Sequence, residues 1–342
     1  MKKKTALITG ISGQDGSYLA NFLLKKNYNV VGSDRRSARS NLWRLKHLNI
    51  QDKIKFEELE LTESSELERL IKKYKFDEIY NLAAQSFVAT SFSSPMNTCN
   101  VSGFAVLRFL EVIRNSKQKI KLYQASSSEM FGGVLEKKQN ENTPFNPQSP
   151  YAVAKTFGHY LINNYRSSYG MFCVSGILFN HESPLRGQEF VTKKITTGIA
   201  KLVNGDIKCL ELGNIYAKRD WGYAKEYVEL MWKMLQKKKP EDFVISTGES
   251  HSIKEFVNVA MGAAEIKTKW VGKGLNERLI DIKNKRIIVK INKKFFRPAE
   301  VNYLRGDSSK AKRLLKWKPK TTFNELVKKM VEFDLENYSI FN

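Results

Sequence analysis

The chain has 342 residues, of which 42% are hydrophobic and 11% aromatic, so it can bury a sizeable core and is not a disordered chain. It contains no run of about 18 apolar residues, which excludes a membrane-spanning helix, and its first apolar stretch stops at Gly10, too early for a secretion signal. The net charge is +23, but the cations are scattered lysines rather than a basic tail or a nucleic-acid module, so we expect a cytoplasmic protein with no membrane or nucleic-acid partner.

The first half of the chain alternates strand-like and helix-like segments. Residues 5–9 form a short, β-branched apolar run before Gly10, and apolar residues then recur at helical spacing over 18–23. Further strands are predicted at 29–33, 54–56, 79–82 and 120–123, with helices at 65–71 and 105–113. This alternation is typical of an α/β protein with a Rossmann-type, doubly wound parallel sheet.

The second half is less regular. Helices are predicted at 191–202, 224–235, 253–263 and 323–335, whereas 271–294 mixes charges with short β-branched runs and gives no clear pattern. We expect a dinucleotide-binding domain at 1–182, to which 222–248 returns, and a smaller, mixed substrate domain formed by 183–221 and 249–342. Three widely spaced cysteines, Cys99, Cys173 and Cys209, predict neither a disulfide framework nor a metal site.

Glycines follow the first predicted strand at Gly10, Gly13 and Gly16, just before a predicted helix. This GxxGxxG spacing provides a tight turn and lets the backbone approach a pyrophosphate at a helix N-terminus. The glycine loop therefore predicts a dinucleotide site.

The residues at the end of the second predicted strand indicate whether the bound dinucleotide is NADP or NAD. Arg35 and Arg36 are adjacent there, and a guanidinium offers a charged, bidentate donor to the 2′-phosphate of NADP. Asp34 is the competing signal, because a carboxylate at this place can hold the ribose hydroxyls of NAD. We predict NADP.

Tyr151 and Lys155 lie four residues apart, on one face of a helix that begins near Pro150. A neighbouring ammonium lowers the pKa of a tyrosine, which is otherwise a poor base at neutral pH. A serine hydroxyl from the strand end at 126–128 completes a Ser-Tyr-Lys set. Glu129 adds a carboxylate that simple reductases and 4-epimerases do not need, but that elimination of water across C5 and C6 of a sugar does.

The sequence resembles the GDP-mannose 4,6-dehydratase family of extended short-chain dehydrogenases over about residues 5–335. The matching strings are ALITGISGQDGSYL (6–19), YNLAAQS (80–86), GILFNHESPLRG (176–187), LGNIYAKRDW (212–221), FRPAEV (296–301) and LKWKP (315–319).

The resemblance implies specific site residues. Catalysis would involve Ser127, Glu129, Tyr151 and Lys155, with Ser127 in place of the family's threonine. Cofactor contacts would come from Gly10, Ile11, Ser12, Gly13, Gln14, Asp15, Gly16, Arg35, Arg36, Ser37, Ala38, Glu60, Leu61, Leu82, Ala83, Ala84, Gln85, Ser86, Tyr151, Lys155, His181 and Arg186. The GDP-sugar would contact Ser86, Asn180, Lys193, Arg219, Arg297 and Glu300. Glu60 and Leu61 stand where the family usually has Asp-Leu, so the carboxylate is retained on a longer side chain and the geometry of the adenine contact is left open.

These residues predict an enzyme that converts GDP-mannose to GDP-4-keto-6-deoxymannose by internal hydride transfer through NADP and loss of water. Alternatives are the same reaction on a related sugar such as GDP-manno-heptose, a 4-epimerase or reductase that lacks the elimination step, and a nucleic-acid binder, against which the intact triad argues. The resemblance also implies a homo-oligomer, either a dimer or a tetramer.

Overall fold

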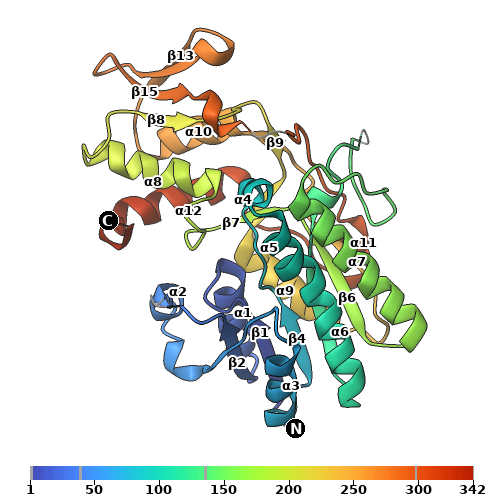
Figure 1. Ribbon diagram of the computed structural model, residues 1–342. Coiled ribbons are helices and arrows are strands. Elements are labelled where there is room, and N and C mark those ends of the chain that lie inside the picture. The colour runs from blue at the N-terminus through green and yellow to red at the C-terminus, as the bar shows by residue number, and fades with distance from the viewer. Residues whose placement is uncertain (1–2, 38–40, 135–136, 297–298, 342) are drawn as a thin grey trace.

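The computed structural model describes residues 3–37, 41–134, 137–296 and 299–341, which form two lobes (Figure 1). The larger lobe is built on a seven-stranded parallel sheet in the order β11-β6-β5-β4-β1-β2-β3. Its strands are β1 (Thr5–Thr9), β2 (Asn29–Asp34), β3 (Lys55–Glu58), β4 (Glu78–Asn81), β5 (Lys121–Ser127), β6 (Cys173–Leu178) and β11 (Phe243–Ile245). This sheet confirms the predicted Rossmann-type class.

Helices cover both faces of the sheet. One face carries α1 (Gln14–Lys25), α2 (Trp43–His47), α9 (Ala224–Leu235) and α11 (Ser309–Leu315). The other carries α3 (Ser64–Lys73), α6 (Ala105–Ser116) and α7 (Pro150–Tyr169). Shorter elements in this lobe are η1 (Gln51–Lys53), α4 (Val88–Ser93), α5 (Pro95–Cys99), the π-helical turn η2 (Asn100–Phe104) and η3 (Ser128–Met130).

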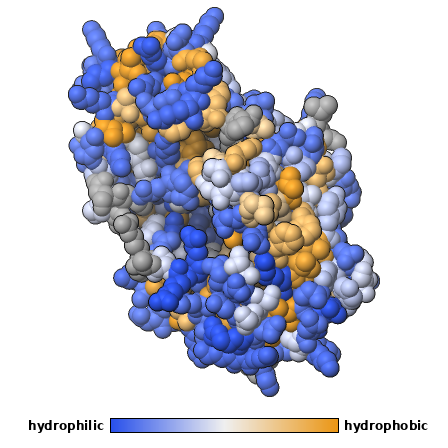
Figure 2. Space-filling view, in the orientation of Figure 1, coloured by the Kyte–Doolittle hydropathy of each residue, from blue (hydrophilic) through white to orange (hydrophobic). Residues whose placement is uncertain are grey.

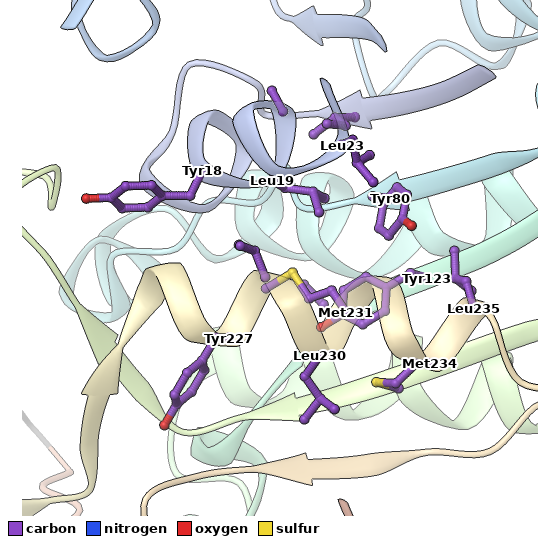
Figure 3. Packing of buried hydrophobic residues seen from close by; sticks show 14 of the residues in the cluster. Tyr18, Leu19, Leu23, Tyr80, Tyr123, Tyr227, Leu230, Met231, Met234 and Leu235 are labelled. Atoms are coloured by element: carbon purple, nitrogen blue, oxygen red, sulfur yellow. The ribbon is translucent and has the colours of Figure 1, made fainter. Parts of the chain in front are cut away.

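Apolar contacts pack α1 and α9 against each other and against one face of the seven-stranded sheet. Leu19 and Leu23 of α1 face Met231 of α9, and Tyr80 and Tyr123 of the sheet fill the space between the helices (Figure 3). All five side chains are buried. Helix α9 and the edge strand β11 both pack in the larger lobe, although the helix at 191–203 and the strand at 210–212, which precede them in the chain, pack in the smaller one.

The smaller lobe has a four-stranded mixed sheet in the order β13-β14-β15-β8, packed against three helices. Its elements are α8 (Val191–Val203), β8 (Leu210–Leu212), α10 (Ile253–Ala263), β13 (Thr268–Val271), η4 (Gly274–Asn276), β14 (Arg278–Asp281), β15 (Arg286–Ile291), η5 (Lys293–Phe295), α12 (Phe323–Glu336) and η6 (Tyr338–Phe341). Capping boxes start α10 (Ser252 with Glu255) and α12 (Thr322 with Glu325).

Two short strand pairs join the lobes. β7 (Asn180–Glu182) pairs with β10 (Trp221–Tyr223), and β9 (Lys218–Arg219) pairs with β12 (His251–Ser252). Within the described residues, no helix is long and apolar enough to cross a membrane.

Candidate active site

A cavity of about 1330 Å³ lies between the lobes, at the carboxyl ends of the parallel strands. This is where open α/β sheets bind ligands. The larger lobe contributes the glycine loop, the residues that follow β4 and β5, and the start of α7, whereas the smaller lobe contributes 212–214 and 294–296. Side chains from elements that are far apart in the sequence therefore line one cavity.

The glycine loop forms one wall of the cavity. Gly10 has a φ of +67°, in the left-handed region that favours glycine. A Cβ on Gly16 would lie 2.2 Å from the Gly10 carbonyl oxygen, so the loop and the first turn of α1 touch backbone to backbone. Gly13 is the N-cap of α1, with no side chain over the helix end. This bare helix N-terminus fits the pyrophosphate of a dinucleotide.

The predicted tyrosine and lysine line the cavity from α7. Ser149 caps this helix by accepting a hydrogen bond from Ala152 N (3.1 Å), and Pro150 occupies its first turn. Lys155 Nζ donates to the Ala125 carbonyl (2.9 Å) and lies 5.8 Å from the centre of the Tyr151 ring. The helix therefore presents both side chains to the end of β5.

Burial dominates the ionisation of this pair. It raises the pKa of Tyr151 to about 12; the hydrogen bond with Ser127 works against this rise, and the nearby Glu129 carboxylate adds to it. Burial lowers the pKa of Lys155 to about 8, so this side chain still carries its proton at neutral pH.

Ser127 and Glu129 lie where β5 turns into η3. Ser127 Oγ accepts a hydrogen bond from Glu129 N (3.2 Å) and also bonds Tyr151. Glu129 is only 9% exposed and lines the cavity beside Ser127 and Tyr151. A hydroxyl, a phenol, an ammonium and a carboxylate thus meet in one buried corner, which is a set suited to two separate proton transfers.

Basic residues line the rest of the cavity. Arg186 Nε lies 3.1 Å from Glu182 Oε2, and its guanidinium covers the Phe190 ring at 3.6 Å. Arg219 Nη2 lies 3.5 Å from Glu300 Oε1. Held in place by carboxylates, these two guanidinium groups suit a diphosphate. The predicted site residues that line the cavity are Gly10, Gly13, Gln14, Asp15, Gly16, Leu82, Ala84, Ser86, Ser127, Glu129, Tyr151, Lys155, Asn180, His181, Arg186, Arg219 and Glu300.

Lys193, for which a sugar contact is expected, lies outside the cavity lining. Lys193 is fully buried, and its ammonium bonds Asp334 of α12 and the Pro184 carbonyl (2.7 Å). It thus joins α8 to α12 instead of lining the cavity, whereas the next residue, Lys194, does line it.

Other predicted cofactor contacts lie behind or beside the cavity lining. Ile11 is fully buried, and Ser12 N donates to Asp34 Oδ2 (3.0 Å). Arg35 and Arg36 are exposed just after β2. Ser37, Glu60, Leu61, Ala83 and Gln85 are also outside the lining, and Ala38 and Arg297 fall outside the described residues.

Arg44 of α2 is a site residue that sequence reasoning missed. It lines the cavity, stacks on Trp43 at 4.5 Å and donates to the carbonyls of Ser12 (3.0 Å) and Leu185 (2.6 Å). It therefore ties the glycine loop to the segment between the lobes. No local pattern marks Arg44, because its partners lie 32 and 141 residues away.

Comparisons with known proteins agree with this geometry. The family model described as GDP-mannose 4,6 dehydratase matches residues 7–330. The GDP-mannose 4,6 dehydratase of Drosophila melanogaster is 49% identical over 98% of this chain and 87% of its own length. The GDP-mannose 4,6-dehydratase of Vibrio cholerae serotype O1 is also 49% identical, over 98% of this chain and 95% of its own length.

Solved structures with low sequence identity share the fold. The dTDP-glucose 4,6-dehydratase of Bacillus anthracis, in complex with NAD, has a TM-score of 0.81 at 21% identity and covers 98% of both chains. RMD from Pseudomonas aeruginosa, complexed with NADPH, has a TM-score of 0.75 at 18% identity, over 98% of this chain and 100% of its own.

Proposed function

This chain belongs to the GDP-mannose 4,6-dehydratase family, and we propose that it converts GDP-mannose to GDP-4-keto-6-deoxymannose in the cavity between its lobes. The observation that carries the residue assignment is the buried corner in which Glu129 joins Ser127 and Tyr151. The bare glycine turn at the start of α1 would hold the nicotinamide dinucleotide. A bound nicotinamide supplies hydride acceptance from C4 of the sugar and hydride return to C6.

The first proton transfer is assigned to Tyr151. Its phenolate removes the O4 proton as C4 is oxidised, and Ser127 hydrogen-bonds the same sugar oxygen. Burial makes the phenolate costly, since it raises the pKa of Tyr151 to about 12. The Lys155 ammonium, one turn along the same helix, offsets part of that cost because it is an adjacent positive charge.

The second proton transfer is assigned to Glu129. Once C4 is a ketone, the hydrogen on C5 is acidic, and the Glu129 carboxylate removes it. The protonated Glu129 then gives a proton to the departing C6 hydroxyl, so the carboxylate is regenerated as water leaves. As hydride returns to C6, C5 takes up a proton from solvent, and Tyr151 releases the O4 proton to solvent. Arg219 holds the diphosphate of the GDP-sugar and so keeps the sugar in place against Tyr151 and Glu129.

Within the nicotinamide dinucleotides, we assign NADP to this chain. Arg35 and Arg36 follow β2 directly and are exposed, so their guanidinium groups are accessible to a 2′-phosphate. Asp34, in contrast, accepts a hydrogen bond from Ser12 N (3.0 Å). Burial raises the pKa of this carboxyl, and the Ser12 hydrogen bond and the nearby Arg35 offset only part of that rise. The carboxylate that could favour NAD is thus engaged with the glycine loop.

A homo-oligomer is supported by an apolar surface on α7 and η2. Val153, Phe157 and Tyr160 lie on one face of α7, and each is at least 40% exposed. Phe104 packs against Phe157 at 5.4 Å and is 48% exposed. Figure 2 shows apolar side chains gathered over this part of the larger lobe. We propose that a second copy of the chain covers this surface.

A single-turnover experiment separates the two proton transfers. Tyr151→Phe, loaded with NADP⁺ and mixed with GDP-mannose, should show no nicotinamide reduction. Glu129→Gln keeps the size of the side chain but cannot accept a proton, so it should reduce its bound NADP⁺ yet release little product, with a loss of about 10²–10⁴-fold in rate. Glu68→Gln, at an exposed glutamate of α3, is the matched control. Normal turnover by Glu129→Gln would refute the assignment.

A further inference from the structure

An acidic side chain lies in the first turn of the helix whose N-terminus should bind a pyrophosphate. Asp15 is the second residue of α1, two residues after Gly13, and it lines the cavity. A helix N-terminus attracts either a carboxylate or a phosphate, but two anions at the same helix end repel each other. The pyrophosphate cradle therefore needs a positive charge that cancels Asp15.

His181 of β7 is in position to supply that charge. Its Nε2 lies 2.7 Å from Asp15 Oδ2, and its Nδ1 lies 2.7 Å from the Phe179 carbonyl oxygen. A carbonyl and an ionised carboxylate can only accept hydrogen bonds. Both ring nitrogens must then carry a proton, so the ring is an imidazolium.

The surroundings favour this charged form. Burial opposes the charge of His181, but the Asp15 carboxylate outweighs it, and the pKa of His181 is raised. Burial likewise opposes the charge of Asp15, yet His181 and Arg186 together keep its pKa lowered. The ring also stacks on Tyr227 of α9 at 4.9 Å, and Gln14 Nε2 donates to Asp15 Oδ1 (3.0 Å).

Arg186 also contributes positive charge near Asp15, but its charge is shared with Glu182, whose Oε2 lies 3.1 Å from Arg186 Nε. Glu182 in turn accepts a hydrogen bond from the Thr192 hydroxyl (2.5 Å). His181 and Glu182 are adjacent in β7, and of the two it is His181 that bonds the Asp15 carboxylate at the start of α1.

We infer that His181 is a protonated positioning residue that cancels the charge of Asp15, so that the dinucleotide pyrophosphate can occupy the N-terminus of α1. This inference rests on the proposed function only in assuming that a dinucleotide binds at the glycine loop. It assigns the histidine a charge rather than a direct contact, and it makes the contribution of His181 conditional on Asp15.

Rescue by a second substitution tests that condition. His181→Gln can still donate a hydrogen bond to Asp15 but carries no charge, so it leaves the carboxylate uncancelled. We expect NADP⁺ to bind about tenfold or more weakly by calorimetry at pH 7, which corresponds to ~1.4 kcal/mol or more. Adding Asp15→Asn should restore affinity to within about threefold of the unsubstituted chain, since an amide of the same size removes the uncancelled charge.

Controls separate charge from structure. Asp52→Asn, at an exposed aspartate in η1, should not rescue His181→Gln. If Asp15→Asn also failed to rescue it, and thermal melts showed both proteins folded, His181 would have a merely structural role and the inference would be wrong.

NAD⁺ carries the same pyrophosphate and should repeat the pattern, so a wrong choice of dinucleotide would leave the inference intact. Failure of both dinucleotides to bind the unsubstituted chain would instead overturn the proposed function, and this inference with it.

The ring protonation can be measured without any ligand. The chain has only four histidines, so nitrogen NMR of the imidazole rings can be assigned by single substitutions. We expect His181 to carry both ring protons at pH 7 and to lose one in Asp15→Asn. A neutral His181 in the unsubstituted chain at pH 7 would overturn the inference.

Discussion

Replacing Gly16 with alanine should destroy the dinucleotide cradle while leaving the catalytic corner intact. The added Cβ would lie 2.2 Å from the Gly10 carbonyl oxygen and 2.7 Å from Ile11 Cα, both of which are backbone atoms. An ordinary non-bonded contact is about 3.5 Å, so the loop must move by roughly 1 Å. Such overpacking costs about 1–3 kcal/mol of stability.

The same displacement should also weaken binding. A backbone N–H that moves by roughly 1 Å from a phosphate oxygen loses its hydrogen bond, and a hydrogen bond to a charged group contributes about 1.5–3 kcal/mol. NADP⁺ affinity should therefore fall by about tenfold to a hundredfold for each bond lost. Calorimetric titration measures the affinity, and a thermal melt measures the stability.

Gly262→Ala is the matched control for this substitution. Gly262 lies within α10, and an added Cβ there meets nothing within 4 Å. Alanine in a helix should stabilise the chain by up to about 1 kcal/mol and leave NADP⁺ binding unchanged. Wild-type affinity and melting temperature in Gly16→Ala would refute the argument that the loop and α1 are in backbone contact.

Three further predictions concern the cofactor, the lysine and the assembly. Arg35→Ala should weaken NADP⁺ binding and leave NAD⁺ nearly unaffected, and equal losses by titration would contradict the assignment of NADP. Burial lowers the pKa of Lys155 to about 8 in the folded chain, whereas an exposed lysine in the unfolded chain keeps its ordinary pKa of about 10.5. Between these pH values the unfolded chain binds more protons, so the stability relative to Lys155→Met should rise by up to about 3 kcal/mol in denaturation curves. Phe157→Glu should give a monomer by light scattering, and an unchanged oligomer would show that α7 does not form the interface.

Much of the larger lobe was predictable because its signals are local. The apolar run at 5–9 is β1, and the helical periodicity at 105–113 and 224–235 falls within α6 and α9. The segment 271–294 was not predictable. Its strands β14 and β15 pair with each other and, through β15, with β8, which is more than 70 residues earlier in the chain. Exposed and charged positions in these strands also remove the alternation that marks a half-buried strand.

The residues of the candidate site also fall into those that the sequence predicted and those that it did not. Tyr151, Lys155 and the glycines were identifiable because their chemistry requires a fixed spacing within one helix or one turn. Arg44 and the His181–Asp15 pair depend on contacts between distant segments, which spacing does not reveal. The ion pair between Lys193 and Asp334 also joins distant segments, α8 and α12, and spacing along the chain does not reveal it.

Incubation of the purified protein with GDP-mannose in deuterated water, followed by mass spectrometry, tests the central claim most directly. The account predicts a product that has lost one water, gained deuterium at C5 and left the pool of NADP⁺ unreduced in net amount. A sugar nucleotide of unchanged mass, epimerised at C4, would contradict it.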